Sequence, residues 1–208
     1  MLPSWRSAGP HCARCRRQPA RVVMARSAGR YDGSLRAIIH AFKYDQRRVL
    51  APALAALVVR ACPDWLAEAD AVIPVPLHPM RVLQRGFNQA DDLARHLGRP
   101  VWPALRRRRA GLPQASLPAA RRHANVRDAF ALARWSAPVG RRWSRLLRDR
   151  AVILVDDVMT TGATLEACGR VLRDAGVGTV RALTVARAVT GPRASLPPPP
   201  APSAVQRR

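Results

Sequence analysis

Residues 151–186 constrain the fold of this chain more than any other stretch. The run 151–155 (AVILV) is apolar at every position, as in a strand that is buried on both faces of a parallel sheet. The following residues place apolar side chains on one helical stripe, namely Leu165, Cys168, Val171, Leu172 and Ala175. Gly176 supplies a helix stop, and 180–186 has the pattern of a second strand. The stretch therefore predicts one β–α–β crossover in an α/β protein.

The residues expected to bind a ligand lie between the strand and the helix of this crossover. We expect the strand to end at Asp156 and Asp157, and the helix to begin at Leu165. In open parallel sheets, ligands bind beyond the carboxyl ends of the strands, and the N–H groups of a helix N-terminus attract phosphate. Gly162 would let the backbone approach such an anion. Ionised carboxylates only accept hydrogen bonds, so the aspartates would repel phosphate and suit the vicinal hydroxyl groups of a ribose.

The pattern thus predicts a site for a phosphorylated ribose. The alternative is a buried strand followed by a capped helix, with the aspartates merely exposed at the strand end.

The segment 152–164 (VILVDDVMTTGAT) resembles the 5-phosphoribosyl 1-pyrophosphate (PRPP) motif of type I phosphoribosyltransferases. Three more segments are similar to the ComF family, a branch of that group linked to bacterial competence and DNA uptake: 31–45 (YDGSLRAIIHAFKYD), 71–90 (AVIPVPLHPMRVLQRGFNQA) and 112–130 (LPQASLPAARRHANVRDAF). The resemblance covers roughly residues 11–188. It implies a type I phosphoribosyltransferase fold, a mostly parallel sheet flanked by helices, with a small N-terminal appendage.

The resemblance also implies a reaction. Pyrophosphate leaves the anomeric carbon of PRPP, the sugar gains positive charge, and a nitrogen nucleophile attacks. Asp156 and Asp157 would be the catalytic residues, holding the 2′ and 3′ hydroxyls and steadying that charge. Mg²⁺ would bridge the pyrophosphate and the sugar hydroxyls. The 5′-phosphate would be held by Val158, Met159, Thr160, Thr161, Gly162, Ala163 and Thr164.

Two basic segments would complete the site. The loop expected at 76–86 would hold the pyrophosphate through Leu77, His78, Arg81 and Arg85, because guanidinium forks match phosphate oxygens; a solvated basic turn is the alternative. The stretch 106–130 resembles the flap that closes over PRPP, with contacts from Gln114, Arg121 and Arg122. Gly111 stands where relatives commonly carry a threonine.

Cys12 and Cys15 are candidate zinc ligands, but they supply only half of a zinc site. Cys12 and Cys15 form a CxxC pair, but a structural zinc ribbon needs four ligands and hence a second pair. ComF relatives usually carry two such knuckles, so we expect residues 1–30 to be a remnant zinc-ribbon-like or loose segment. Cys62 and Cys168 lie in helical patterns and are expected in the core.

The charge admits two explanations. The formal net charge is +23, and residues 99–150 hold 14 arginines against two aspartates. Such a surface attracts nucleic acid, including single-stranded DNA, and other polyanions. However, the chain has a single lysine, Lys43, among its 36 basic residues, a skew that codon bias in a GC-rich genome would also produce.

The remaining patterns predict one phosphoribosyltransferase-like domain over 31–189 and a disordered Pro-rich tail over 190–208. Within the domain we expect helices from Ser34, over 49–61 and from Asn88 or Gln89, a strand over 71–75, and a basic loop or hairpin over 104–130. Neither a membrane span nor a signal peptide is visible, which favours a cytoplasmic protein.

Three functions remain open: a PRPP-dependent transferase with an unknown acceptor, a non-catalytic competence protein that uses a PRPP-type site as sensor or scaffold and grips single-stranded DNA together with the competence machinery, or a regulator that binds another phosphorylated ribose.

Overall fold

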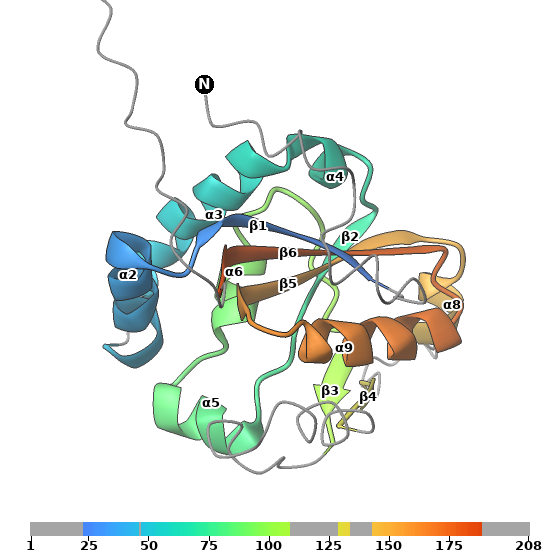
Figure 1. Ribbon diagram of the computed structural model, residues 1–208. Coiled ribbons are helices and arrows are strands. Elements are labelled where there is room, and N and C mark those ends of the chain that lie inside the picture. Colours follow the sequence, from blue (N-terminus) through green and yellow to red (C-terminus); the bar gives the residue numbers. More distant parts are fainter. Residues whose placement is uncertain (1–22, 46, 109–128, 134–142, 189–208) are drawn as a thin grey trace, which may run out of the picture.

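A four-stranded parallel sheet forms the centre of the protein (Figure 1). The computed structural model describes residues 23–45, 47–108, 129–133 and 143–188. The strand order is β1 (Met24–Arg30), β6 (Thr179–Arg187), β5 (Ala151–Met159) and β2 (Ala71–Pro74). A separate antiparallel pair joins β3 (Leu105–Arg107) to β4 (Phe130–Leu132), which confirms strand pairing at the two ends of the expected hairpin.

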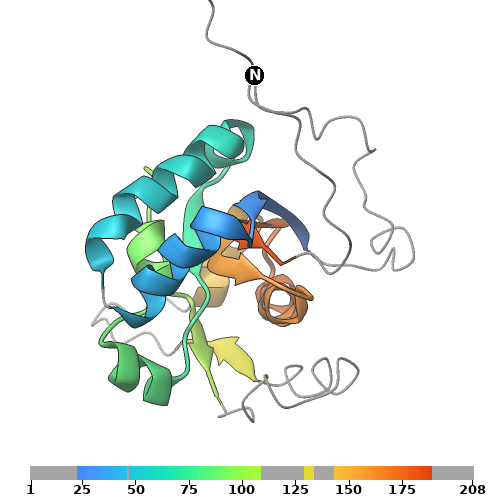
Figure 2. The same ribbon diagram turned by 60° about the vertical axis from the view of Figure 1, so that its left-hand side comes forward.

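Helices cover both faces of the sheet. One face packs against α2 (Gly33–Tyr44), α3 (Ala51–Ala61), α4 (Pro63–Ala67) and α6 (Gln89–Ala94). The other face packs against α8 (Trp143–Leu147), α9 (Ala163–Asp174) and the β3–β4 pair. Figure 2 shows α9 nearly end-on at one side of the sheet, with α2 and α3 at the other. The fold is therefore the layered α/β arrangement that the crossover pattern predicted.

The β5–α9–β6 crossover is confirmed, with shifted boundaries. β5 does not end at the aspartates but continues to Met159, because β6 runs alongside it and pairs Ala186 with Val158. α9 begins at Ala163, two residues earlier than the apolar stripe indicated. Gly176 ends the turn after α9 with a φ of 91°, in the left-handed region that glycine favours.

The predicted helices of the first half are present. Ile39 and Phe42 anchor α2 and are fully buried. A short 3₁₀ turn at Arg48–Leu50 precedes α3, which carries Pro52 in its first turn. α6 begins after Asn88, whose side-chain oxygen accepts a hydrogen bond from the Ala90 N–H at 3.2 Å. Strand β2 ends one residue before the predicted boundary.

The prediction of an irregular loop over 76–86 is wrong, because this segment contains a helix, α5 (Pro79–Arg85). The His78 side chain caps it by accepting a hydrogen bond from the Met80 N–H at 3.2 Å, and Pro79 occupies its first turn. Gly86 closes it with a φ of 77°. A cap, an N-terminal proline and a C-terminal glycine are helix signals that a periodicity analysis overlooks in so short an element.

The expectation of a loose N-terminal segment is wrong for 24–30, which form edge strand β1 beside β6. The sequence MARSAGR lacks apolar alternation, so tertiary contacts stabilise this strand. The Ser27 hydroxyl lies 2.7 Å from the Thr184 hydroxyl, and Arg26 stacks on Trp65 with its guanidinium carbon 4.1 Å from the ring centroid. The expected CxxC pair, most of the flap and the tail fall at 1–22, 109–128 and 189–208, outside the described residues.

Cys62 and Cys168 are buried in the two cores, as expected. Within the described part of the chain, none of the helices has the length and apolarity that crossing a membrane requires.

Candidate ribose phosphate site

Asp156 and Asp157 are consecutive on β5, so their side chains lie on opposite faces of the sheet. Asp157 is buried, at 8% exposed, and faces the helical layer that contains α2. There its Oδ1 lies 3.0 Å from the Nζ atom of Lys43. Asp156 is partly buried and has Arg107 of β3 and Cys168 of α9 as electrostatic neighbours. Each carboxylate therefore has a cation near it, supplied by a different layer of the fold.

The pKa of the Asp156 carboxyl group is raised above its ordinary value. Burial, and secondly repulsion from Asp157, raise its pKa to about 7. The Asp157 N–H, which donates to Asp156 Oδ1 at 2.8 Å, and the charges of Lys43 and Arg107 act in the opposite direction. A carboxyl group poised near neutral pH beside an ion-paired one is typical of sites that bind or react rather than of structural aspartates.

The loop after β5 leads directly into the N-terminus of α9. Gly162 has a φ of 79° and precedes the first residue of α9, a helix of 12 residues. The Thr161 hydroxyl accepts a hydrogen bond from the Ala163 N–H at 3.3 Å and so steadies the turn. The other N–H groups of the first helical turn have no acceptor within an α-helix, and they carry the positive end of its dipole. This arrangement suits a phosphate group.

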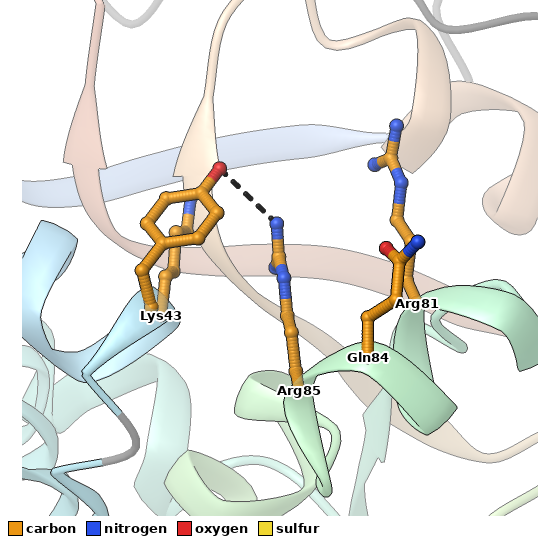
Figure 3. A pocket seen from close by; sticks show the side chains of 5 residues that line it. Lys43, Arg81, Gln84 and Arg85 are labelled. Atoms are coloured by element: carbon orange, nitrogen blue, oxygen red, sulfur yellow. Dashed lines mark hydrogen bonds between the residues drawn. The ribbon is translucent and has the colours of Figure 1, made fainter.

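A pocket of about 340 Å³ lies between α2 and α5, and its lining residues are Lys43, Tyr44, Arg81, Gln84 and Arg85. Figure 3 shows Arg81, Gln84 and Arg85 rising from α5 and Lys43 extending from α2. The Arg85 guanidinium donates to the Tyr44 hydroxyl at 3.2 Å and to Gln89 Oε1 at 3.1 Å. Three cations converge on this pocket, which makes it suited to a polyanion.

The structure brings together most of the residues expected at the site that it describes. The aspartates and the segment 158–164 lie at the carboxyl end of β5, and Arg81 and Arg85 line the pocket. His78, by contrast, caps α5, and Leu77 is a partly buried residue before that cap. Gln114, Arg121 and Arg122 lie outside the described residues, as do Cys12 and Cys15.

Sequence reasoning missed four residues near the site. Lys43, Tyr44 and Gln84 line the pocket, and Arg107 lies near Asp156. Burial lowers the pKa of the Arg107 guanidinium, and the nearby Arg81 adds to this effect. One signal for Lys43 was available, since it is the only lysine among 36 basic residues.

Within the described segments, no three His, Cys, Asp or Glu side chains gather into a possible metal site. A pair of carboxylates does, however, fit an ion that arrives with a phosphate ligand and keeps most of its waters.

Comparison with known proteins identifies the family to which this chain belongs. The profile of the phosphoribosyl transferase domain matches residues 80–198. The chain is 34% identical over 190 residues to competence protein F of Haemophilus influenzae, covering 86% of this chain and 79% of that protein. The chain belongs to the ComF family. Another relative is the DNA utilization protein YhgH of Escherichia coli O157:H7, 32% identical over 196 residues, covering 89% of this chain and 81% of that one.

The fold of this ComF protein is that of type I phosphoribosyltransferases, as the sequence resemblance implied. Among solved structures, the allosteric regulatory enzyme of purine biosynthesis is similar at 21% identity with a TM-score of 0.42. The match covers 66% of this chain but only 25% of that enzyme.

Proposed function

We propose that this protein binds PRPP at the carboxyl end of β5 and transfers the phosphoribosyl group to a nitrogen acceptor, with release of pyrophosphate. The observation that carries this proposal is the ion pair between Lys43 and Asp157. Because Lys43 also lines the pocket with Arg81 and Arg85, groups suited to a diol adjoin groups suited to pyrophosphate. PRPP is a ligand that presents a diol, a pyrophosphate and a 5′-phosphate on one sugar.

Each part of the ligand would have its own partners. The 5′-phosphate would bind the loop around Gly162 and the N-terminus of α9. Asp156 and Asp157, when ionised, would accept hydrogen bonds from the ribose hydroxyls and stabilise the positive charge that develops on the ring. Arg81 and Arg85 would bind the pyrophosphate as it leaves. Mg²⁺ bound with PRPP would supply charge neutralisation of the leaving pyrophosphate.

The names of the relatives, competence protein F and DNA utilization protein YhgH, support a link to competence and to the use of DNA. We therefore propose that the protein acts in the cytoplasm in connection with incoming DNA.

Isothermal titration with PRPP and Mg²⁺ tests the binding step. The wild type should bind PRPP at micromolar strength, and Asp156→Asn/Asp157→Asn should weaken binding by tenfold or more, since each lost hydrogen bond to a charged group is worth about 1.5–3 kcal/mol. Equal affinity in the wild type and the double variant would contradict the proposed site. A pyrophosphate-release assay across nucleobases then tests turnover.

The second candidate is a non-catalytic scaffold that binds single-stranded DNA and uses the PRPP-type site as a sensor. The observation that favours it is the net charge of +23, which exceeds what one PRPP ligand requires. PRPP binding without pyrophosphate release for any acceptor tested, together with DNA binding, would support this second function over the first.

A further inference from the structure

We propose that Lys43 couples the two halves of the site: it holds Asp157 when the pocket between α2 and α5 is empty and turns to the anion when a diphosphate group enters that pocket. The inference rests on the proposed function and adds a positioning residue to it. In this view, occupation of the pocket by pyrophosphate makes Asp157 available to the ribose diol.

The first step is the position of Lys43, which lies between Asp157 and the pocket lined by α5. Its Nζ atom is 3.0 Å from Asp157 Oδ1, and the Lys43 and Asp157 side chains are 15% and 11% exposed. Ile39 and Phe42, both fully buried, fix α2 against the sheet on the face where Asp157 lies. The core therefore anchors the helix that carries Lys43, and the ion pair itself is largely shielded from solvent.

The second step is that the same ammonium belongs to the pocket. Lys43 shares the lining with Arg81, Gln84 and Arg85 from α5 (Figure 3). An ammonium group has three N–H donors, and among the described residues the ion-pair partner of Lys43 is Asp157. A diphosphate in the pocket would carry more negative charge than Asp157 and would compete for those donors.

The third step concerns the chemistry of lysine. The other 35 of the 36 basic residues are arginines, so position 43 differs from every other basic position in the chain. Lysine is a compact charge on a flexible stem that can turn from one acceptor to another, whereas arginine binds a carboxylate with a rigid two-pronged fork. An arginine at position 43 would keep the charge but hold Asp157 more firmly, and the exchange would be lost.

The consequence is cooperative binding. While Lys43 occupies Asp157, fewer lone pairs of this carboxylate are available to sugar hydroxyls. When Lys43 turns to pyrophosphate, those lone pairs are released. Pyrophosphate should therefore raise the affinity for a diol ligand, and the diol ligand should raise the affinity for pyrophosphate by the same factor.

Calorimetry with two partial ligands tests the coupling. Ribose 5-phosphate supplies the diol and the phosphate, and inorganic pyrophosphate supplies the anion, both at constant Mg²⁺. In the wild type we expect saturating pyrophosphate to tighten ribose 5-phosphate binding by about fivefold or more. In Lys43→Arg, both ligands should still bind, but pyrophosphate should no longer tighten the binding of ribose 5-phosphate. Arg85→Lys is the matched control, because it alters the same pocket without touching Asp157. It should weaken pyrophosphate binding and keep the enhancement.

The outcomes separate the two proposals. An enhancement of equal size in the wild type and Lys43→Arg, or none in the wild type, would overturn the coupling and leave PRPP binding intact. Failure of the wild type to bind either ligand or PRPP would overturn the proposed function together with the coupling.

A second measurement needs no variant. Because the chain has one lysine, ¹⁵N-labelled protein has one lysine ammonium signal, which Lys43→Arg removes and so assigns. Pyrophosphate that binds should shift this signal. A signal that stays in place while calorimetry records pyrophosphate binding would overturn the proposal.

Discussion

At the scale of single residues, the chemistry depends on which face of a strand each side chain occupies. Asp156 and Asp157 are adjacent in sequence, yet one lies near Arg107 and the other contacts Lys43 across the sheet. Sequence reasoning identified both carboxylates because two charges directly after an apolar strand are conspicuous. It could not assign their partners, since Lys43 is 114 residues from Asp157 and Arg107 belongs to another element.

The raised pKa of Asp156 predicts a pH-dependent stability. Between about pH 4 and pH 7 the folded protein holds a proton that the unfolded chain has released, so the free energy of unfolding should fall as the pH rises through this window. The cost is at most about 4 kcal/mol, since one pKa unit corresponds to about 1.4 kcal/mol. Asp156→Asn should remove much of this fall, and urea unfolding between pH 5 and pH 8 measures it.

The control for Asp156→Asn is Asp149→Asn, which removes an exposed carboxylate and should retain the pH dependence of the wild type. An unchanged pH dependence in Asp156→Asn would contradict the raised pKa. PRPP affinity should move in the opposite sense and rise through about pH 7, because only the ionised carboxylate is purely an acceptor.

At the scale of elements, the sequence predicts the β–α–β crossover but not the short helix α5. The apolar strand, the amphipathic helix and its glycine stop specify β5–α9–β6 locally, and they also place the loop that we propose binds phosphate. α5 has seven residues, none of them buried, so it has no apolar stripe from which to predict it. Its helical state follows from the cap at His78, Pro79 and the turn at Gly86 instead.

Gly162 should be required both for the turn and for ligand approach. We expect Gly162→Ala to cost about 1–2 kcal/mol of stability, because its φ of 79° is strained for a residue with a Cβ. It should also weaken ribose 5-phosphate binding, since the added methyl group would lie where the backbone meets the anion. Thermal unfolding and calorimetry measure the two effects separately.

Gly98 provides the matched control for that substitution. Its φ is 70°, and a Cβ there would meet no atom within 4 Å. Gly98→Ala should therefore cost a similar stability while leaving ligand affinity unchanged. Equal affinity in Gly162→Ala and Gly98→Ala would remove Gly162 from the phosphate site.

At the scale of the whole molecule, the sheet divides the interior into two cores. Ile153 packs with α2, α3 and α6, whereas its neighbour Leu154 packs with α8 and α9. Both side chains are essentially inaccessible to solvent. The edge strand β1 completes the sheet through contacts with β6 and α4. The sequence pattern of β1 alone does not predict these contacts.

Substitutions in the two cores should act independently. Ile153→Val is expected to cost about 1 kcal/mol and Leu154→Ala about 3 kcal/mol. In the double variant the two losses should add to within about 0.5 kcal/mol, because the two side chains belong to separate core clusters on opposite faces of the sheet. Urea unfolding measures all three proteins, and a large departure from additivity would indicate that the two cores are coupled through β5.

The net charge makes a separate prediction for DNA. If the basic surface binds single-stranded DNA, log K should fall linearly with log salt, with a slope of about −0.7 for each phosphate contacted. Asp156→Asn/Asp157→Asn should leave this slope unchanged. Fluorescence anisotropy with labelled oligonucleotides measures it, and affinity that does not depend on salt would exclude the electrostatic scaffold.

The sequence by itself determined the β–α–β crossover, the position of its loop and the family, because these depend on contiguous residues whose spacing encodes strand, turn and helix. Only the tertiary structure decided that β1 joins the sheet and that Lys43 meets Asp157. It also decided that Arg81 and Arg85 share a pocket with α2. These features join residues that are distant along the chain, and their energies come from packing and ion pairing in three dimensions, which a linear pattern does not record.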